Sequence, residues 1–288
     1  MNYSVWMENR KSVREFTDKK VPAALAEKMQ SYHDGAVKRL LPERKTELRI
    51  FGDSAKEALE GAAGYHQFLI GAPMYLVLLS EVGPRDLENA GYIMEDLVLK
   101  ATELGLGSCW ITFADGEQIK KALDIQSGLA VAAIAAIGYG APARKRPRIN
   151  VLTMSQVDIP AQRRYMEPKR SVRDLVYMEN WGSHHNLEDF IGFYDDMLWE
   201  AFYAVTLAPS YLNRQAYGFV LHNDRVTLVK RPDVHTTEMD GMLSLGIALL
   251  HFTSVAESWS GKIKWQLGKD AAKPEIPQGY EVAASAVL

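Results

Sequence analysis

This 288-residue sequence has a single cysteine, Cys109, and lacks long hydrophobic runs. One cysteine excludes an intramolecular disulfide, which favours a reducing compartment. The longest apolar runs, at 68–79 and 129–138, have about a dozen residues or fewer, whereas a helix that crosses a membrane needs roughly twenty. The first eight residues reach the charged Glu8 without an apolar segment of the kind that signal peptides carry. We therefore expect a cytoplasmic protein with no membrane segment.

Charge of one sign does not dominate either. The sequence has 33 Lys and Arg against 36 Asp and Glu, a formal net charge of -3, and therefore no general attraction to nucleic acid or to an acidic membrane. A hydrophobic fraction of 47% and a charged fraction of 24% are those of an ordinary globular protein. No nucleic-acid or membrane partner is therefore expected, although a basic cluster could still bind one anionic ligand.

Several catalytic and cofactor-binding signatures are also missing. The chain has no G-x-S-x-G nucleophile elbow, no G-x-x-x-x-G-K-[ST] phosphate loop and no G-x-G-x-x-G dinucleotide fingerprint. His184 and His185 lack further ligands at metal spacing, so we expect no metal site. Cys109 lies in an apolar strand candidate and is expected to pack rather than to act as a nucleophile.

Hydrophobic periodicity predicts helices and short buried strands in alternation. Helices are expected at 23–41, 54–68, 85–103, 116–123, 187–207 and 238–257, and strands at 73–79, 108–113, 129–138, 217–221, 226–229 and 262–267. The stretch 139–169 is rich in Arg, Lys and Pro and has no periodicity, which indicates a long connection.

The two longest predicted helices resemble each other. Their first residues, 88–92 (ENAGY) and 238–242 (EMDGM), align Gly91 with Gly241, and each helix is followed by a short strand that contains a Trp. Similarity of this kind indicates an internal duplication, although two apolar helices can also align by chance.

A cluster of three cations and a hydroxyl lies near the N-terminus, at Arg10, Lys11, Ser12 and Arg14. A phosphomonoester brings close to two negative charges, which Arg can bind bidentately while Ser donates one more hydrogen bond. Taken alone, the cluster is better explained by a solvated charged surface. Further cations at Arg144, Lys145, Arg146 and Arg148, or at Lys169, Arg170 and Arg173, could complete a phosphate site.

The segment 208–217 (APSYLNRQAY) follows one predicted helix and precedes a strand. Pro209, Ser210 and Asn213 are ordinary turn residues, so a plain loop is one interpretation. Two carboxamides and a hydroxyl so close together can also donate and accept along the edge of a polar heteroaromatic ring. The residues alone leave both interpretations open.

Together these segments resemble the flavin mononucleotide (FMN)-dependent nitroreductase family. Its subunits carry R-x-S-x-R near the N-terminus, an A-P-S-x-x-N segment at the flavin of the partner subunit, and a helix that ends in L-G-L-G-S-x-W-I. The corresponding segments here are 10–14 (RKSVR), 104–111 (LGLGSCWI) and the G-Y strand end at 138–139, followed by a tail-like stretch at 169–182.

The order of these motifs is unusual for the family. The A-P-S-x-x-N segment is absent between 41 and 52 and occurs instead at 208–217, with Ala216 where the family has Pro; the second half in turn lacks R-x-S-x-R. The order is similar to a fused pseudo-dimer that keeps one complete flavin site. We interpret 1–182 as a nitroreductase-like half with the phosphate site and 183–288 as a degenerate half that completes the flavin site.

The resemblance implies an α+β fold with a mainly antiparallel central sheet flanked by helices, in two pseudo-symmetric halves. It also implies a monomer, because the dimer interface would be internal. The cofactor-binding residues that it implies are Arg10, Lys11, Ser12, Arg14, Ile111, Thr112, Lys169, Arg170, Pro209, Ser210, Leu212, Asn213 and Gln215. Tyr65 and His66 stand where the family has polar side chains before its first strand.

By the same resemblance, FMN carries the chemistry and no catalytic side chain is required. NAD(P)H would reduce the flavin, which would then reduce a nitroaromatic, quinone or similar acceptor in a ping-pong cycle. The alternatives are another flavin reaction on this fold (enone reduction, dehalogenation or flavin reduction) and a flavin-binding or scaffold protein without turnover. Substrate selection is expected in loops such as 42–52.

Overall fold

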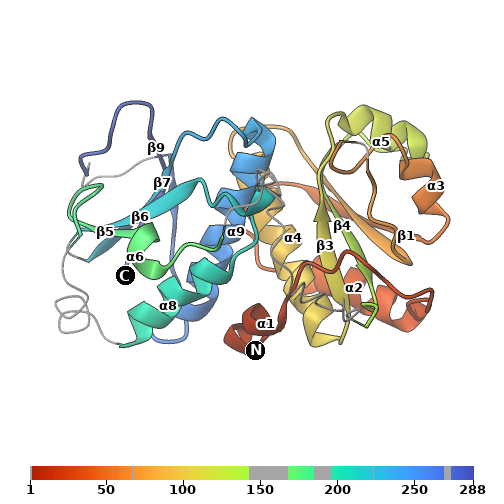
Figure 1. The fold of residues 1–288 in the computed structure, drawn as a ribbon, viewed down its shortest axis with the longest axis horizontal. Helices are drawn as coiled ribbons and strands as arrows, with labels where there is room; N and C mark the ends of the chain where they lie inside the picture. Colours follow the sequence, from red (N-terminus) through yellow and green to blue (C-terminus); the bar gives the residue numbers. More distant parts are fainter. Residues whose placement is uncertain (1, 67, 143–167, 185–195, 223, 269–273) are drawn as a thin grey trace, which may run out of the picture.

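In a computed structural model of the chain, the residues described are 2–66, 68–142, 168–184, 196–222, 224–268 and 274–288. They form two β-sheets on either side of a pair of long helices (Figure 1). Most of the expected connection at 139–169 lies outside the described residues. So do the basic residues at 144–148 and the first part, 187–195, of the helix expected at 187–207.

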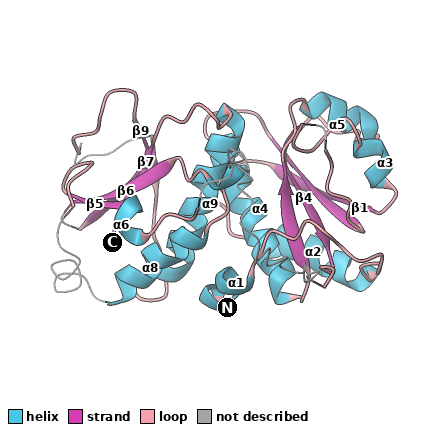
Figure 2. Cartoon of the chain, in the orientation of Figure 1, coloured by secondary structure: helices cyan, strands magenta, loops and turns pink. Residues whose placement is uncertain are grey.

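The first half contains a four-stranded antiparallel sheet in the order β1-β2-β4-β3. Its elements are α2 (Ala23–Gly35), β1 (Thr46–Gly52), α3 (Ala55–Leu59), β2 (Met74–Ser80), α4 (Asp86–Glu103), β3 (Gly107–Ile111), α5 (Gly116–Ala122) and β4 (Ala130–Gly138). Helices cover both faces of this sheet (Figure 2). Tyr75, Val77 and Leu79 of β2 pack toward α3 and α5, whereas Leu76 and Leu78 pack toward α4. This is why β2 is a continuous apolar run rather than an alternating one.

The second half contains a five-stranded sheet in the order β5-β6-β7-β9-β8, in which the edge strand β5 is contributed by the end of segment 1–182. Its elements are α6 (Val172–Leu175), β5 (Val176–Met178), α8 (Asp196–Leu207), the 3₁₀ turn η1 (Tyr211–Asn213), β6 (Tyr217–His222), β7 (Arg225–Lys230), α9 (Glu238–Ala256), β8 (Gln266–Leu267) and β9 (Glu281–Val287). Strand β5 runs parallel to β6, and the other pairings are antiparallel. The N-terminal helix α1 (Tyr3–Asn9) also packs into this half, since Tyr3 and Met7 belong to its hydrophobic core.

The two sheets repeat one topology. When β1, β2, β3 and β4 are matched with β6, β7, β8 and β9, the strand order is the same in both halves. Both sheets also have a register shift at the same pairing, after Leu78 in β2 and after Leu228 in β7. The structure therefore confirms an α+β fold built from two pseudo-symmetric halves.

Helices α4 and α9 lie between the sheets and pack closely against each other (Figure 1). A Cβ atom on Gly91 would collide with the carbonyl oxygen of Leu243, and one on Gly246 would collide with the carbonyl oxygen of Glu88. These reciprocal contacts make Gly246 the counterpart of Gly91. The alignment of Gly91 with Gly241 expected from the sequence is therefore wrong by five residues, because two apolar helices match at several registers.

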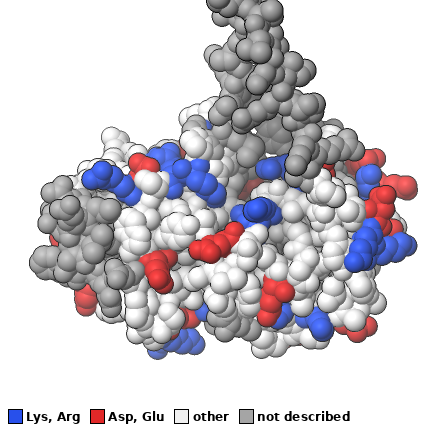
Figure 3. All heavy atoms as spheres, turned by 60° about the horizontal axis from the view of Figure 1, so that its bottom comes forward, with Lys and Arg blue, Asp and Glu red and all other residues white. Residues whose placement is uncertain are grey.

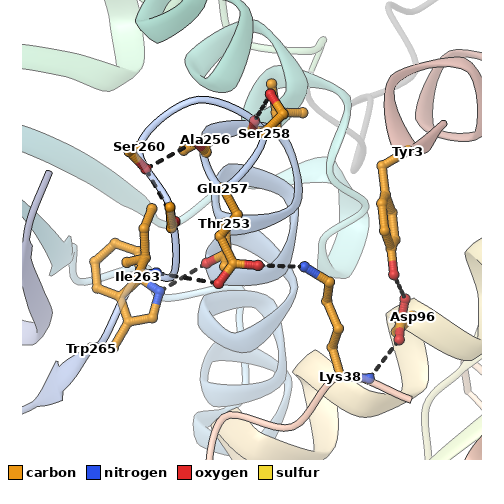
Figure 4. A network of polar contacts seen from close by, with 12 residues as sticks. Tyr3, Lys38, Asp96, Thr253, Ala256, Glu257, Ser258, Ser260, Ile263 and Trp265 are labelled. Atoms are coloured by element: carbon orange, nitrogen blue, oxygen red, sulfur yellow. Dashed lines mark hydrogen bonds and ion pairs between the residues drawn. The ribbon is translucent and has the colours of Figure 1, made fainter. Parts of the chain in front are cut away.

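Polar contacts also join the halves (Figure 4). Lys38, after α2, forms an ion pair with Glu257 at the end of α9, with 2.7 Å between Nζ and Oε2. The buried Asp96 of α4 accepts hydrogen bonds from the Tyr3 hydroxyl at 2.8 Å and from the Lys38 backbone N–H at 2.7 Å. These bonds fix α1 and the segment after α2 against the central helices.

Among the described residues, α9 is the one helix long and apolar enough, by length and composition, to cross a membrane. Most of it is buried inside the protein, where its leucines face α4, α8 and the second sheet. It is the core helix of the second half.

Several expected elements differ from those observed. The helix expected at 54–68 ends at Leu59, because Gly61 and Gly64 adopt positive φ angles of 76° and 103°. The stretch 42–52, expected as a loop, contains the edge strand β1, whose few apolar residues alternate with charged ones. The helix expected at 23–41 ends at Gly35, and the strand at 262–267 is reduced to two residues. Elements α1, β5 and β9 were not predicted.

Candidate functional site

A cavity of about 690 Å³ lies between the two halves. Both halves contribute to its wall, the second through 209–213 and the face of α9 that carries Asp240, Leu243 and Ser244. Among the residues expected to bind a cofactor, those that line this cavity are Arg10, Ser12, Arg14, Ile111, Thr112, Lys169, Pro209, Ser210, Leu212 and Asn213. Segments about 200 residues apart in the sequence thus meet at one site, which lies in the size range of small-molecule pockets.

The N-terminal basic segment is held at the open edge of β3. Ser12 forms a parallel β-bridge with Ser108, and the Val13 N–H donates to the Ser108 carbonyl at 2.8 Å. Further along, the Thr17 N–H donates to the Tyr139 carbonyl at 2.8 Å. This pairing places Arg10, Ser12 and Arg14 against the cavity instead of leaving them on a free loop.

Cations collect at this end of the cavity. The Arg10 side chain is only 7% exposed, and its Nε has no hydrogen-bond partner among the described residues. The Lys169 side chain lines the cavity and is partly exposed to solvent there. Its ammonium donates to the carbonyl oxygens of Leu207 and Ala208. Burial and the neighbouring Arg10 lower the pKa of Lys169 to about 8. Unpaired positive charge at this end therefore raises the free energy of the protein, and a bound anion would lower it.

Glu95 of α4 is the buried acid behind these cations. Its Oε1 lies 3.6 Å from Arg10 Nε and 3.0 Å from His251 Nε2, and its Oε2 accepts a bond from Trp110 Nε1 at 2.8 Å. The other ring nitrogen of His251 lies 2.8 Å from the Ala204 carbonyl oxygen. Glu95 and His251 were not predicted as site residues, and their network connects Arg10 at the wall of the cavity with the core of the second half.

The loop between α8 and β6 is strained. Leu212, Asn213 and Gln215 have positive φ angles of 47°, 58° and 42°, a region that non-glycine residues enter at a cost of about 1–2 kcal/mol each. The Ser210 hydroxyl accepts a bond from the Gln215 N–H at 2.9 Å and closes the turn. Strain of this kind concentrates at ligand-binding sites.

The opposite end of the cavity is aromatic and carries one acid. Tyr65 and Tyr211 have ring centroids 6.4 Å apart, and Phe68 is 77% exposed. Thr112, at the end of β3, donates a hydrogen bond to Asp240 of α9 with an Oγ1–Oδ1 distance of 3.2 Å. Asp240 was not predicted as a site residue, because an acid in the first turn of a helix is common for helix stability alone.

A comparison with protein-family models gives one match, described as "Putative TM nitroreductase", over residues 4–256. The chain belongs to this nitroreductase family. Membership places it among the nitroreductase-type oxidoreductases, with the fold described above.

Several solved structures are similar to this chain, and the first of them shares its fold. A "putative nitroreductase" from Thermotoga maritima MSB8 is 19% identical, with a TM-score of 0.60, and the match covers 100% of this chain and 94% of that one. An FMN-dependent nitroreductase from Clostridium difficile R20291 is 22% identical, with a TM-score of 0.40, and the match covers 54% of this chain and 97% of that one. A nitroreductase family protein from Clostridium novyi NT is 22% identical, with a TM-score of 0.42, and the match covers 49% of this chain and 87% of that one. No curated protein matches the sequence.

Three of the expected site residues of this nitroreductase lie away from the cavity wall. Lys11 is exposed, and Arg170 and Gln215 contact each other instead. The fully buried Gln215 accepts a bond from the Arg170 N–H at 2.8 Å through Oε1, and its Nε2 donates to the Thr206 carbonyl at 3.3 Å. Gln215 thus joins the segment after the long connection to the loop that lines the cavity.

The pseudo-symmetric counterpart of the cavity differs in its side chains. The relation that exchanges Gly91 and Gly246 carries Asp240 to Arg85 and Ser244 to Asn89. Arg85 forms an ion pair with Glu88 at 2.7 Å and packs over Gly268, and Asn89 accepts bonds from the backbone N–H groups of Leu40 and Leu41. Arg85 and Asn89 are thus bonded to other parts of the protein, whereas their counterparts Asp240 and Ser244 line the cavity.

Proposed function

We propose that this chain is an FMN-dependent oxidoreductase that binds one FMN in the cavity between its halves. It would accept hydride from NAD(P)H and reduce a nitroaromatic, quinone or similar acceptor in a ping-pong cycle. The observation that carries the proposal is the meeting of the N-terminal basic segment with the strained loop at 209–213 in one cavity of about 690 Å³. The family membership of the chain supports the same reaction class.

The residues present fit FMN. Arg10 Nε is buried without a hydrogen-bond partner among the described residues, and Arg14 and Lys169 lie beside it. A phosphate dianion would satisfy these groups and compensate their charge, as the single acid Glu95 cannot do for all three. Ser210 and Asn213, on the opposite wall, offer a hydroxyl and a carboxamide to the polar edge of a flavin ring.

When bound, FMN would supply two-electron transfer between NAD(P)H and the acceptor. The chain itself would contribute binding and orientation. Arg10, Ser12, Arg14 and Lys169 would hold the phosphate end, and Leu243 and Ile247 of α9 would exclude water from one side of the cavity. We further propose that the chain acts as a monomer, because both halves of the site are on one polypeptide.

On the face shown in Figure 3, basic and acidic side chains are interspersed with broad uncharged areas.

The experiment is reduction of the purified protein under anaerobic conditions. A yellow protein should be bleached by NADH or NADPH, and its colour should return when a quinone or nitroaromatic acceptor is added. A yellow protein that neither nucleotide bleaches would contradict the enzymatic part of the proposal. A colourless protein that takes up no added FMN would contradict it altogether.

A further inference from the structure

One carboxylate faces the cavity at the end away from the cations. Asp240 is 7% exposed and lines the wall beside Thr112 and Tyr211. Thr112 directly follows β3, and Ser108 on that strand forms a bridge with Ser12 at the cationic end. Four residues of extended strand span about 13 Å, so the cavity has positive charge at one end and a carboxylate at the other.

Asp240 keeps hydrogen-bonding capacity toward the cavity. The Thr237 hydroxyl donates to Oδ2 at 2.6 Å, whereas the Thr112 hydroxyl is shared between Oδ1 at 3.2 Å and Oδ2 at 3.3 Å. A carboxylate offers about four acceptor positions, and a long, shared contact satisfies Oδ1 poorly. Oδ1 can therefore accept a stronger bond from a molecule in the cavity.

Helix capping explains only part of this arrangement. The Thr237 hydroxyl accepts a bond from the Asp240 N–H at 3.1 Å, which is the usual start of a helix. Capping does not account for the approach to Thr112, which belongs to the other half, nor for burial at a cavity wall. That burial raises the pKa of Asp240, against the lowering effect of the two threonine hydroxyls. A cationic partner would remove the cost of burying the charge.

The neighbouring side chains favour the same kind of partner. Tyr211 and Tyr65 lie near Asp240 and expose aromatic rings at this end of the cavity. Aromatic faces attract cations, and this attraction adds to that of a carboxylate. With FMN in place, its phosphate would occupy the opposite end beside Arg10 and Lys169, so the acceptor would meet the end of the cavity that carries Asp240.

We propose that Asp240 is a specificity-determining residue that selects acceptors bearing an ammonium group over acceptors bearing a carboxylate on the same aromatic core. The inference rests on the proposed FMN-dependent function, because it concerns the molecule that shares the cavity with the flavin. It assigns to the second half of the chain a role in substrate choice as well as in cofactor binding.

The test uses the flavin-loaded protein and three acceptors that differ in one group: 4-nitrobenzylamine, 4-nitrobenzyl alcohol and 4-nitrobenzoate. Dissociation constants come from the change in flavin absorbance of the oxidised protein, and kcat/KM is measured separately. The variant is Asp240→Asn, which can still accept the threonine bonds. The control is Glu238→Gln, which removes an equal charge from the same helical turn at an exposed site paired with Lys230.

The wild type and Glu238→Gln should bind the amine about tenfold to a hundredfold more tightly than the alcohol, as expected for one charge-assisted bond. They should bind the carboxylate least tightly. Asp240→Asn should bind all three within a few-fold of one another. Equal constants in the wild type, or a preference that survives in Asp240→Asn, would overturn the assignment to Asp240 and leave the flavin function intact. Failure to bind flavin would overturn both.

Discussion

Gly91 of α4 and Gly246 of α9 are exchanged by the pseudo-two-fold relation between the halves, and each lies against the backbone of the other helix. A methyl group at either position meets a carbonyl oxygen, which is held in place by the helical hydrogen bonds of the opposite helix. The backbones of the two halves are in close contact here, and Ser244 and Ile247, which flank Gly246 on α9, line the cavity. The stability of the fold and the geometry of the site thus depend on the same crossing.

The crossing predicts equivalent effects at the two glycines. Gly91→Ala and Gly246→Ala should each lower the free energy of unfolding by at least about 1–3 kcal/mol, the usual cost of overpacking a core. Denaturant unfolding followed by circular dichroism measures this. Gly35→Ala is the control, because a Cβ there meets nothing within 4 Å. Unchanged stability in both variants would contradict the close crossing.

Arg10 should be the strongest single contributor to binding of the phosphate group. Arg10→Ala removes a charge-assisted contact and should weaken FMN binding about tenfold to a hundredfold. Fluorescence titration of the apoprotein gives the dissociation constant. Lys11→Ala should leave it nearly unchanged, because Lys11 is exposed and lies away from the cavity wall. Riboflavin, which has no phosphate, should bind both variants equally, and a loss of riboflavin affinity in Arg10→Ala would argue against a phosphate contact.

Binding of FMN should depend on pH through Lys169. Its pKa is about 8 in the free protein, lowered by burial and by Arg10. A phosphate dianion favours the ammonium form and raises this pKa in the complex, so binding takes up a proton between the two values. Above about pH 6, where the phosphate is a dianion, FMN affinity should therefore be highest up to about pH 8 and fall as the pH rises further. In Lys169→Met this part of the pH dependence should disappear; its persistence would assign the titration to another group.

Gln215 should stabilise the protein without binding the flavin directly. Its side chain makes two buried bonds, with the Arg170 N–H and the Thr206 carbonyl, and Gln215→Ala leaves both partners unsatisfied. The expected loss is about 1–3 kcal/mol in unfolding free energy. FMN affinity should fall less than in Arg10→Ala. A variant with wild-type stability but no flavin binding would instead place Gln215 in the cofactor site.

Long apolar patterns made most of the fold predictable. Helices α4 and α9 end within one residue of their expected bounds, because each has several turns of uninterrupted apolar periodicity. Strand β1 could not be recognised in the same way, since Leu48 and Ile50 alternate with charged residues over a short edge strand. Its pairing with β2 decides its conformation, and that pairing is a long-range property of the fold.

In the candidate site, too, some residues were predictable from the sequence and others were not. The meeting of Arg10, Ser12 and Arg14 with 209–213 was expected because two local motifs resemble those of the nitroreductase family. Asp240 and Glu95 carry no local signal, because each lies in a regular amphipathic helix. They become candidates only through contacts with Thr112 and Arg10, which are distant in sequence. Gln215 was expected at the flavin because it adjoins the motif, yet a left-handed backbone turn directs it toward Arg170.

The most direct test of a single shared site is the molar ratio of flavin to protein, measured after saturation with FMN on material whose mass in solution is known. One FMN per chain is expected, released by denaturation and identified as FMN rather than riboflavin. Two FMN per chain would contradict the inference that Arg85 and Asn89 fill the pseudo-symmetric position with contacts to the protein itself. A protein that binds no flavin at all would contradict the proposal that the cavity between the halves holds FMN.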